Sequence, residues 1–390
     1  MTDIGQSSIT VNHPLLALLG DLEPGSPGDC WARIKLHLPA STDLRARSGS
    51  FTTPWNAVSP YRQPLPDLAT PENRSFKELM DSRAQEIYQS SRSLGKKLML
   101  MWSGGIDSTG MLTALLKHIP TNEQADLITI CLTPDSIMEN FEFYRRYISG
   151  RLPIIHKINV DISDDFFRNT IITSGDTADH LFFFGGLAFR ERFGTDIWTK
   201  PWRDNLDRLL NPQFENHSYS WKFLYSKVVE NMRQSDLPDL NSVGDVFYWL
   251  QLNFMWEGTN LRPLHTPSMR KDFRTTIQPK HVHEFLDHIF YSTKDFQRWS
   301  FTNRHRQQSI PYANHTFKQE LRDYIVEFDG NRSYHQFKQK IVSMSFDQIN
   351  DVHWNTHLQP VYFDQNWRGY TLEDQGVKDL ILQKLKEYQG

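Results

Sequence analysis

Short apolar runs alternate with amphipathic segments along residues 71–160, and this alternation is the clearest pattern in the chain. Each run has the length of a buried strand and is bounded by turn-forming residues. The three predicted strands are Leu98–Trp102, Asp126–Leu132 and Pro153–Val160. Strands that alternate with helices predict an α/β fold with a doubly wound, mainly parallel sheet, whose ligands bind at the carboxyl ends of the strands.

The amphipathic segments predict a helix before the first strand and helices between the strands. The first helix follows Pro71, and Thr70 or Asn73 can provide its N-cap. The second helix starts directly after the first strand and is stopped by Pro120. A third is predicted at Ile137–Ile148.

The pattern changes on both sides of this region. Beyond Phe189 long helical patterns rich in aromatic residues take over, and near the end a hairpin is predicted around Leu358–Phe363 and Gly369–Leu372, followed by a helix. We therefore predict four parts. They are an extended N-terminal arm (1–72), a nucleotide-binding α/β domain (73–190), a mainly helical substrate part (191–350) and a C-terminal hairpin and helix (351–390).

Composition adds limits to this picture. A net charge of −3 over 390 residues argues against a surface that binds polyanions as a whole. The longest apolar runs are too short to cross a bilayer and the N-terminus lacks a signal pattern, so we expect a cytoplasmic protein. The two cysteines, Cys30 and Cys131, are far apart and form no C-x-x-C motif, and Cys131 is predicted to be a buried strand thiol.

The first strand runs directly into a Ser-Gly-Gly-x-Asp-Ser turn followed by a helix. Glycines let the backbone approach a phosphate, hydroxyl groups donate hydrogen bonds, and a helix N-terminus attracts anions. The residues expected to bind phosphate are Ser103, Gly104, Gly105, Asp107, Ser108 and Thr109. A carboxylate at such a site is useful mainly when it holds a divalent metal, so Asp107 is a candidate Mg²⁺ ligand.

A second glycine turn, Ser174–Asp179, again follows an apolar pair and carries two acids three residues apart. Asp176 and Asp179 share one face of a helical first turn, where they could hold magnesium beside the phosphates. The same residues would equally suit an ordinary helix start with Ser174 or Asp176 as the N-cap.

Taken together, the two turns resemble those of the asparagine synthetase branch of the PP-loop ATP pyrophosphatases. Ser103–Ser108 matches that family's S-G-G-x-D-S, and the segment S-G-D-T-A-D-H-L-F resembles its S-G-x-G-x-D-E-L-F. Thr177 and His180 depart from the second motif. The resemblance implies an adenine nucleotide alpha hydrolase-like (HUP-like) fold, ATP bound also by Gly175 and Asp176, and Mg²⁺ held by Asp107 and Asp179.

Two further groups of residues follow from this resemblance. The end of the second strand, at Leu132 and Thr133, is expected to lie beside the adenosine, although an ordinary strand-ending turn explains it too. Lys318–Arg322 matches a K-x-x-L-R segment, after which the family has a lysine facing the α-phosphate; Lys338 and Lys340 are the candidate catalytic lysines.

The resemblance implies an ATP-dependent ligase. A substrate carboxylate would be adenylylated, with release of pyrophosphate, and then passed to ammonia or an amine to form an amide. Since we see no glutaminase domain, the nitrogen is expected from free ammonia, an amine substrate or a separate glutaminase partner.

Two other readings remain open. The stretch Arg262–Arg306 mixes basic and aromatic residues, so the chain could modify a nucleobase in RNA or DNA, although such a stretch is also typical of solvated helix faces. The departures at Thr177 and His180 would suit a protein that binds ATP without turnover.

Overall fold

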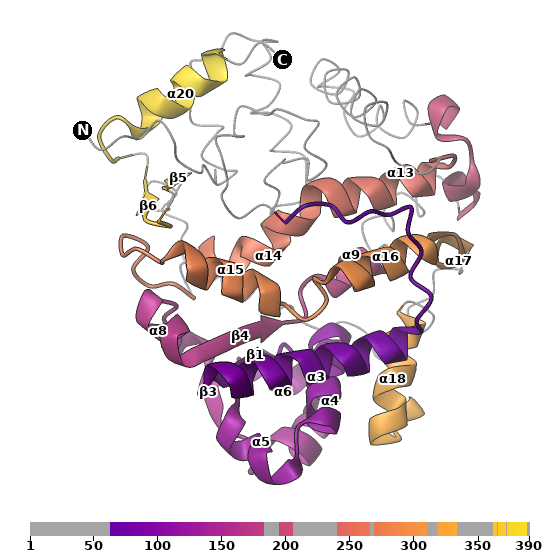
Figure 1. Cartoon of the computed structure of the whole chain (residues 1–390), viewed down its shortest axis with the longest axis vertical. Coiled ribbons are helices and arrows are strands. Elements are labelled where there is room, and N and C mark those ends of the chain that lie inside the picture. Colours follow the sequence, from indigo (N-terminus) through magenta and orange to yellow (C-terminus); the bar gives the residue numbers. More distant parts are fainter. Residues whose placement is uncertain are drawn as a thin grey trace.

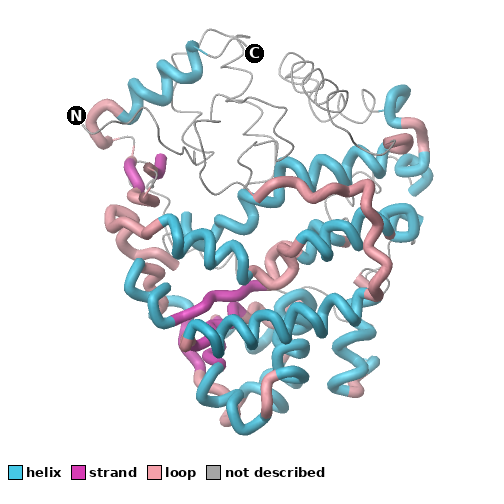
Figure 2. Tube along the Cα trace, in the orientation of Figure 1, coloured by secondary structure: helices cyan, strands magenta, loops and turns pink. Residues whose placement is uncertain are grey.

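The computed structural model describes residues 63–182, 195–205, 240–265, 269–309, 318–333, 362–364, 366–371 and 373–387. Four parallel strands form the main sheet, in the order β3-β2-β1-β4 (Figures 1 and 2). They are β1 (Lys97–Met101), β2 (Ile128–Leu132), β3 (Ile154–His156) and β4 (Thr170–Ser174). The prediction of an α/β fold with a doubly wound parallel sheet is confirmed.

The strand order places a crevice beside β1. The chain moves outward from β1 to β2 and β3, and then returns to add β4 on the other side of β1. Connections that leave neighbouring strands in opposite directions open a crevice at the carboxyl ends, where ligands of such sheets bind. The two predicted glycine turns follow β1 and β4, so they meet at this switch point.

Helices make up most of the remaining described chain (Figure 2). In and around the sheet lie α3 (Phe76–Leu94), α4 (Ile106–His118), α5 (Thr121–Leu127), α6 (Pro134–Glu139), α7 (Phe141–Phe143), a π-helix (Tyr144–Ile148), a 3₁₀ turn (Lys157–Asn159), α8 (Asp164–Asn169) and α9 (Ala178–Leu181). The mainly helical part contains a 3₁₀ turn (Thr195–Thr199), α13 (Val243–Leu250), a π-helix (Gln251–Met255), α14 (Trp256–His265), α15 (Pro279–His288), α16 (Lys294–Thr302), α17 (Arg304–Ser309) and α18 (Gln319–Asp329).

Strands β1, β2 and β4 are largely buried, and β1 packs against helices on both faces of the sheet. Leu98 and Leu100 of β1 belong to a core formed with α3, α4 and α18, whereas Met99 lies on the other face in a core formed with α8, α14 and α15. Figure 1 shows α15 and α3 on opposite sides of β4 and β1. Apolar strands without polar alternation follow from this double cover.

Several boundaries differ from those predicted. The capping box of α3 is formed by Ser75 and Glu78, so neither Thr70 nor Asn73 caps this helix. The second strand begins at Ile128 because Thr121–Leu127 forms α5. The helix predicted at Ile137–Ile148 is instead broken at Asn140, whose backbone is not helical and whose side chain caps α7.

The described C-terminal residues follow the prediction. Strands β5 (Tyr362–Phe363) and β6 (Gly369–Tyr370) pair antiparallel, and α20 (Val377–Glu387) follows. The predicted N-terminal arm lies outside the described residues up to residue 62. Among the described helices, none combines the length and the apolar character needed to span a membrane.

Candidate functional site

The turn after β1 leaves the start of α4 open. Gly105 is the N-cap residue of α4, and glycine has no side chain that could accept a hydrogen bond from the first turn. The first N–H groups of this helix therefore have no side-chain acceptor at the cap and are at the crevice. Gly104 has a φ of 74°, a left-handed conformation that favours glycine. The hydroxyl groups of Ser103 and Ser108 lie 3.0 Å apart and share a hydrogen bond. This open helix start has the features that the sequence predicts for a phosphate-binding turn.

The turn after β4 packs directly on the first one. A Cβ atom added to Gly175 would lie 2.9 Å from the carbonyl carbon of Asp107 and 2.9 Å from the amide nitrogen of Ser108. Ser174 and Thr177 are buried, and neither hydroxyl has a hydrogen-bond partner among the described residues. Buried hydroxyl groups without partners are rare, and a bound ligand is one way of satisfying them.

Lys318 joins the two turns. Its ammonium nitrogen lies 2.5 Å from both carboxylate oxygens of Asp107 and 2.5 Å from Oδ1 of Asp179, and its side chain is only 6% exposed. Burial lowers the pKa of Lys318, but Asp107 and Asp179 outweigh it and the net pKa is raised, so the ammonium stays charged. The two aspartates predicted to share a cation therefore do face a single cationic group.

The backbone of Lys318 is also unusual. Lys318 is the N-cap residue of α18 and has a φ of 57°, in the left-handed region that costs a residue with a Cβ atom about 1 kcal/mol or more. Arg322, one turn into α18, is buried, and its charge interacts with that of Asp107. The N-terminal turn of α18 thus brings two positive side chains to the site.

A segment after α15 holds both turns in place. The amide of Phe290 donates to the carbonyl of Ser174, and the hydroxyl of Tyr291 donates to the carbonyl of Asp107 at 2.9 Å. Burial raises the pKa of Tyr291 well above its usual value, so the phenol remains a donor. The distance between the two turns is therefore set from the helical part of the chain.

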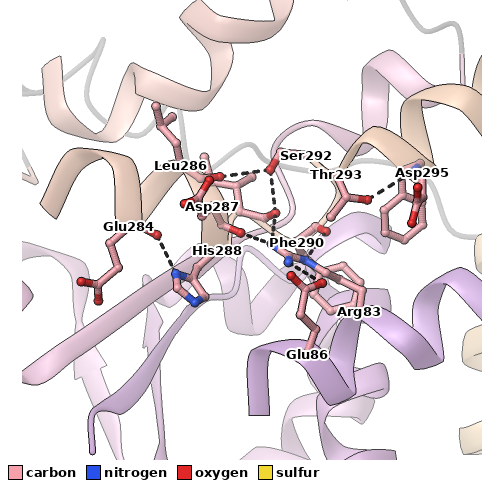
Figure 3. Close-up of polar contacts among 12 residues, drawn as sticks. Arg83, Glu86, Glu284, Leu286, Asp287, His288, Phe290, Ser292, Thr293 and Asp295 are labelled. Atoms are coloured by element: carbon pink, nitrogen blue, oxygen red, sulfur yellow. Dashed lines mark hydrogen bonds and ion pairs between the residues drawn. The ribbon is translucent and has the colours of Figure 1, made fainter. Parts of the chain in front are cut away.

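Arg83 of α3 fixes that segment in turn (Figure 3). Its buried guanidinium donates to the carbonyls of Ile289 at 3.0 Å and Phe290 at 3.1 Å, and also to that of Asp287. Glu86 pairs with it from the solvent side at 2.9 Å. These carbonyls belong to the end of α15 and the residues after it, where a positive charge is favoured.

Other predicted site residues fall in different places. Thr109 is fully buried, and its hydroxyl accepts a hydrogen bond from the indole N–H of Trp102. It therefore packs inside the core behind the turn instead of facing a phosphate. Thr133 forms a capping box with Ser136 at the start of α6, and Leu132 is buried. Asp176 and Asp179 are both partly exposed. Lys338 and Lys340 lie outside the described residues.

The K-x-x-L-R motif contains Lys318 and Arg322 but does not predict that they meet Asp107 and Asp179, and the family resemblance points to Lys338 and Lys340 as the catalytic lysines. Tyr291 and Arg83 are not predicted, since no local pattern marks them. Among the described residues, no group of three or more His, Cys, Asp or Glu side chains is placed to hold a metal without other ligands.

The described basic residues between Arg262 and Arg306 mostly have partners within the chain. Arg274 pairs with Asp374 at 2.8 Å, Arg304 pairs with buried Asp245 at 2.7 Å, and Arg306 pairs with Glu320. Arg298 donates to the carbonyl of Asp67, and Arg270 to two backbone carbonyls. These contacts give no support to an RNA or DNA surface here.

Cys131 is a buried free thiol on β2, as predicted. Burial raises its pKa to about 11, so the reactive thiolate is scarce at neutral pH. It is not suited to sulfur transfer.

Comparison of the chain with protein-family models, with curated proteins and with solved structures gives no significant match. The resemblance to asparagine synthetases therefore rests on the sequence motifs of the two turns and the Lys318 segment.

Replacing Gly175 with alanine is expected to disturb both turns. The new methyl group would meet backbone atoms of Asp107 and Ser108, which cannot rotate away as a side chain would. We expect a loss of about 1–3 kcal/mol in the free energy of unfolding, as for other overpacked sites, measured by urea denaturation. Nucleotide binding should weaken as well.

Gly150→Ala is the matched control for Gly175→Ala. Gly150 has a φ of 68° but open space around its Cβ position, and it precedes β3 at the amino ends of the strands. This variant should lose some stability through backbone strain and retain nucleotide binding. Equal effects of the two variants on binding would contradict the contact between the turns.

Proposed function

We propose that this protein is an AMP-forming ATP pyrophosphatase of the asparagine synthetase type, which adenylylates a carboxylate and passes it to ammonia or an amine. The observation that carries the proposal is the convergence of Asp107, Asp179 and Lys318 at the switch point of the sheet. Each of the three comes from a motif that the asparagine synthetase resemblance singles out.

The environment of the site suits a triphosphate. The start of α4 offers N–H groups, Lys318 and Arg322 offer positive charge, and Ser103 and Ser108 offer hydroxyl groups. The buried hydroxyls of Ser174 and Thr177 are further candidate donors. These groups together would bind the phosphates of ATP near the carboxyl ends of β1 and β4.

The two aspartates also fit magnesium. Mg²⁺ is usually held by one or two carboxylates together with phosphate oxygens, and Asp107 and Asp179 already direct their oxygens toward one cationic group. When bound, Mg²⁺ would neutralise charge that develops on the departing pyrophosphate. Asp107 and Asp179 are the residues that would hold it.

The reaction needs two displacements. An oxygen of the substrate carboxylate attacks the α-phosphorus, and the bond from that phosphorus to the bridging oxygen breaks, so that pyrophosphate leaves. The nitrogen of ammonia or an amine then attacks the acyl carbon, loses a proton, and AMP leaves with its oxygen. Lys318, a compact cation, would stabilise charge on the phosphates; Lys338 and Lys340 remain candidates for the same role.

The products of ATP turnover test the proposal directly. The protein should convert ATP labelled at the α-phosphate to AMP, with release of pyrophosphate, when it is supplied with Mg²⁺ and pools of carboxylic acids and amines. Chromatography of the labelled nucleotide identifies the product. Formation of ADP and orthophosphate would contradict the proposal, as would the absence of binding to an ATP analogue with a methylene group between the α- and β-phosphates.

A further inference from the structure

Lys318 occupies the position between the two candidate metal ligands. Its ammonium is 2.5 Å from oxygens of both Asp107 and Asp179. A divalent cation that used the same carboxylate oxygens would have to take the place of this ammonium. The two cations cannot share the position, because both are positive and the space between the aspartates is already filled.

The charges around the site oppose a free metal ion. Lys318 already contacts both aspartates, the charge of Arg322 interacts with that of Asp107, and both cationic side chains are buried. A metal ion without other ligands would add two positive charges and would leave the Lys318 ammonium in a buried place without its carboxylate partners. Separating a buried charge from its partner is strongly unfavourable.

A triphosphate changes this balance. Its oxygens bring negative charge that can accept the displaced ammonium of Lys318 and can complete the coordination of the metal. Lys318 lies at the very start of α18, so its ammonium is carried on the end of the helix that faces the two aspartates.

We propose that Lys318 acts as a resident counter-ion that excludes free divalent metal, so that the metal enters this site only together with the phosphates of a nucleotide. The proposal rests on the function proposed above, and it adds an order of binding to it. Lys318 thereby protects the aspartates from metal ions until a nucleotide is present.

Titration with Mn²⁺ followed by electron paramagnetic resonance tests this order, because Mn²⁺ prefers the same oxygen ligands as magnesium. Without nucleotide, the wild-type protein should bind Mn²⁺ only weakly. Lys318→Met should bind Mn²⁺ at least about tenfold more tightly, since the aspartates lose their internal cation. Lys117→Met is the matched control: it removes a lysine that pairs with Asp81 at 3.3 Å, away from the site, and should behave as the wild type.

Lys318→Gln provides a second variant if Lys318→Met fails to fold, because glutamine keeps a hydrogen-bond donor without the charge. The result expected for it is the same gain in Mn²⁺ affinity. Wild-type protein that binds Mn²⁺ as tightly as both variants would overturn the proposal. Addition of the methylene analogue of ATP should raise the Mn²⁺ affinity of the wild type; if only this step fails, the proposed function fails while the exclusion of free metal by Lys318 stands.

Discussion

Replacing Asp179 with asparagine is expected to slow AMP formation by about 10³-fold while the chain remains folded. Asparagine has nearly the same shape but lacks the negative charge that would hold Mg²⁺ opposite Asp107. The Asp179 side chain is 36% exposed, and Asp107 still pairs with the buried Lys318 ammonium, so the fold should tolerate the loss of one carboxylate partner. Rates measured with ATP labelled at the α-phosphate, together with circular dichroism of the variant, separate loss of activity from loss of fold.

Asp107→Asn should show a similar loss, and the double variant should be little worse than either single one. Two residues that hold the same ion act as a unit, so their effects do not add. Asp165→Asn on α8 is the control, because Asp165 is 83% exposed and forms a surface ion pair with Arg168. Effects that multiply in the double variant, or a loss below about tenfold in the single ones, would argue against a shared cation.

The centre of the sheet could be predicted from the sequence because β1 and β2 are largely buried on both faces and therefore read as continuous apolar runs. Their exact lengths could not. β3 ends at His156 although apolar residues continue, since it pairs only with β2 in the described sheet and the chain turns into a 3₁₀ helix after it. The helix α5 over residues 121–127 could not be predicted from the spacing of apolar residues, because none of its residues is buried.

The candidate site, too, has parts that the sequence predicts and parts that it does not. Each glycine turn is a contiguous strand-turn-helix segment, so its type can be recognised locally. Lys318 lies 211 residues from Asp107 in the sequence, and Tyr291 lies 184 residues from it. Contacts over such distances depend on how α15 and α18 pack, which periodicity does not encode. The left-handed backbone of Lys318 is equally hidden, because lysine gives no signal for that conformation.

Arg83 also makes its contacts with residues that are far away in the sequence. Its replacement by methionine is expected to lower the free energy of unfolding by about 3 kcal/mol. Arg83 is 3% exposed and donates to three backbone carbonyls at the end of α15 and beyond (Figure 3). Methionine would fill most of the space, and it would remove the cost of burying a charge. It would nevertheless remove the Arg83 hydrogen bonds to all three carbonyls, of which that of Ile289 keeps the amide and hydroxyl of Ser292 as donors, and this loss is the larger of the two effects.

Urea denaturation of Arg83→Met and of Arg92→Met measures the difference. Arg92 lies on the same helix, is 62% exposed and pairs with Glu123 at 3.5 Å, so its loss should cost less than about 1 kcal/mol. Arg83→Lys should recover part of the stability, since lysine keeps the charge but reaches fewer carbonyls.

Hydrogen exchange shows whether Arg83 also positions the site. Because Phe290 and Tyr291 bind Ser174 and Asp107, loosening their segment should speed the exchange of amides in both glycine turns, and Arg83→Lys should restore part of their protection. Faster exchange limited to the end of α15 would mean that Arg83 stabilises that helix and leaves the turns to hold each other through Gly175.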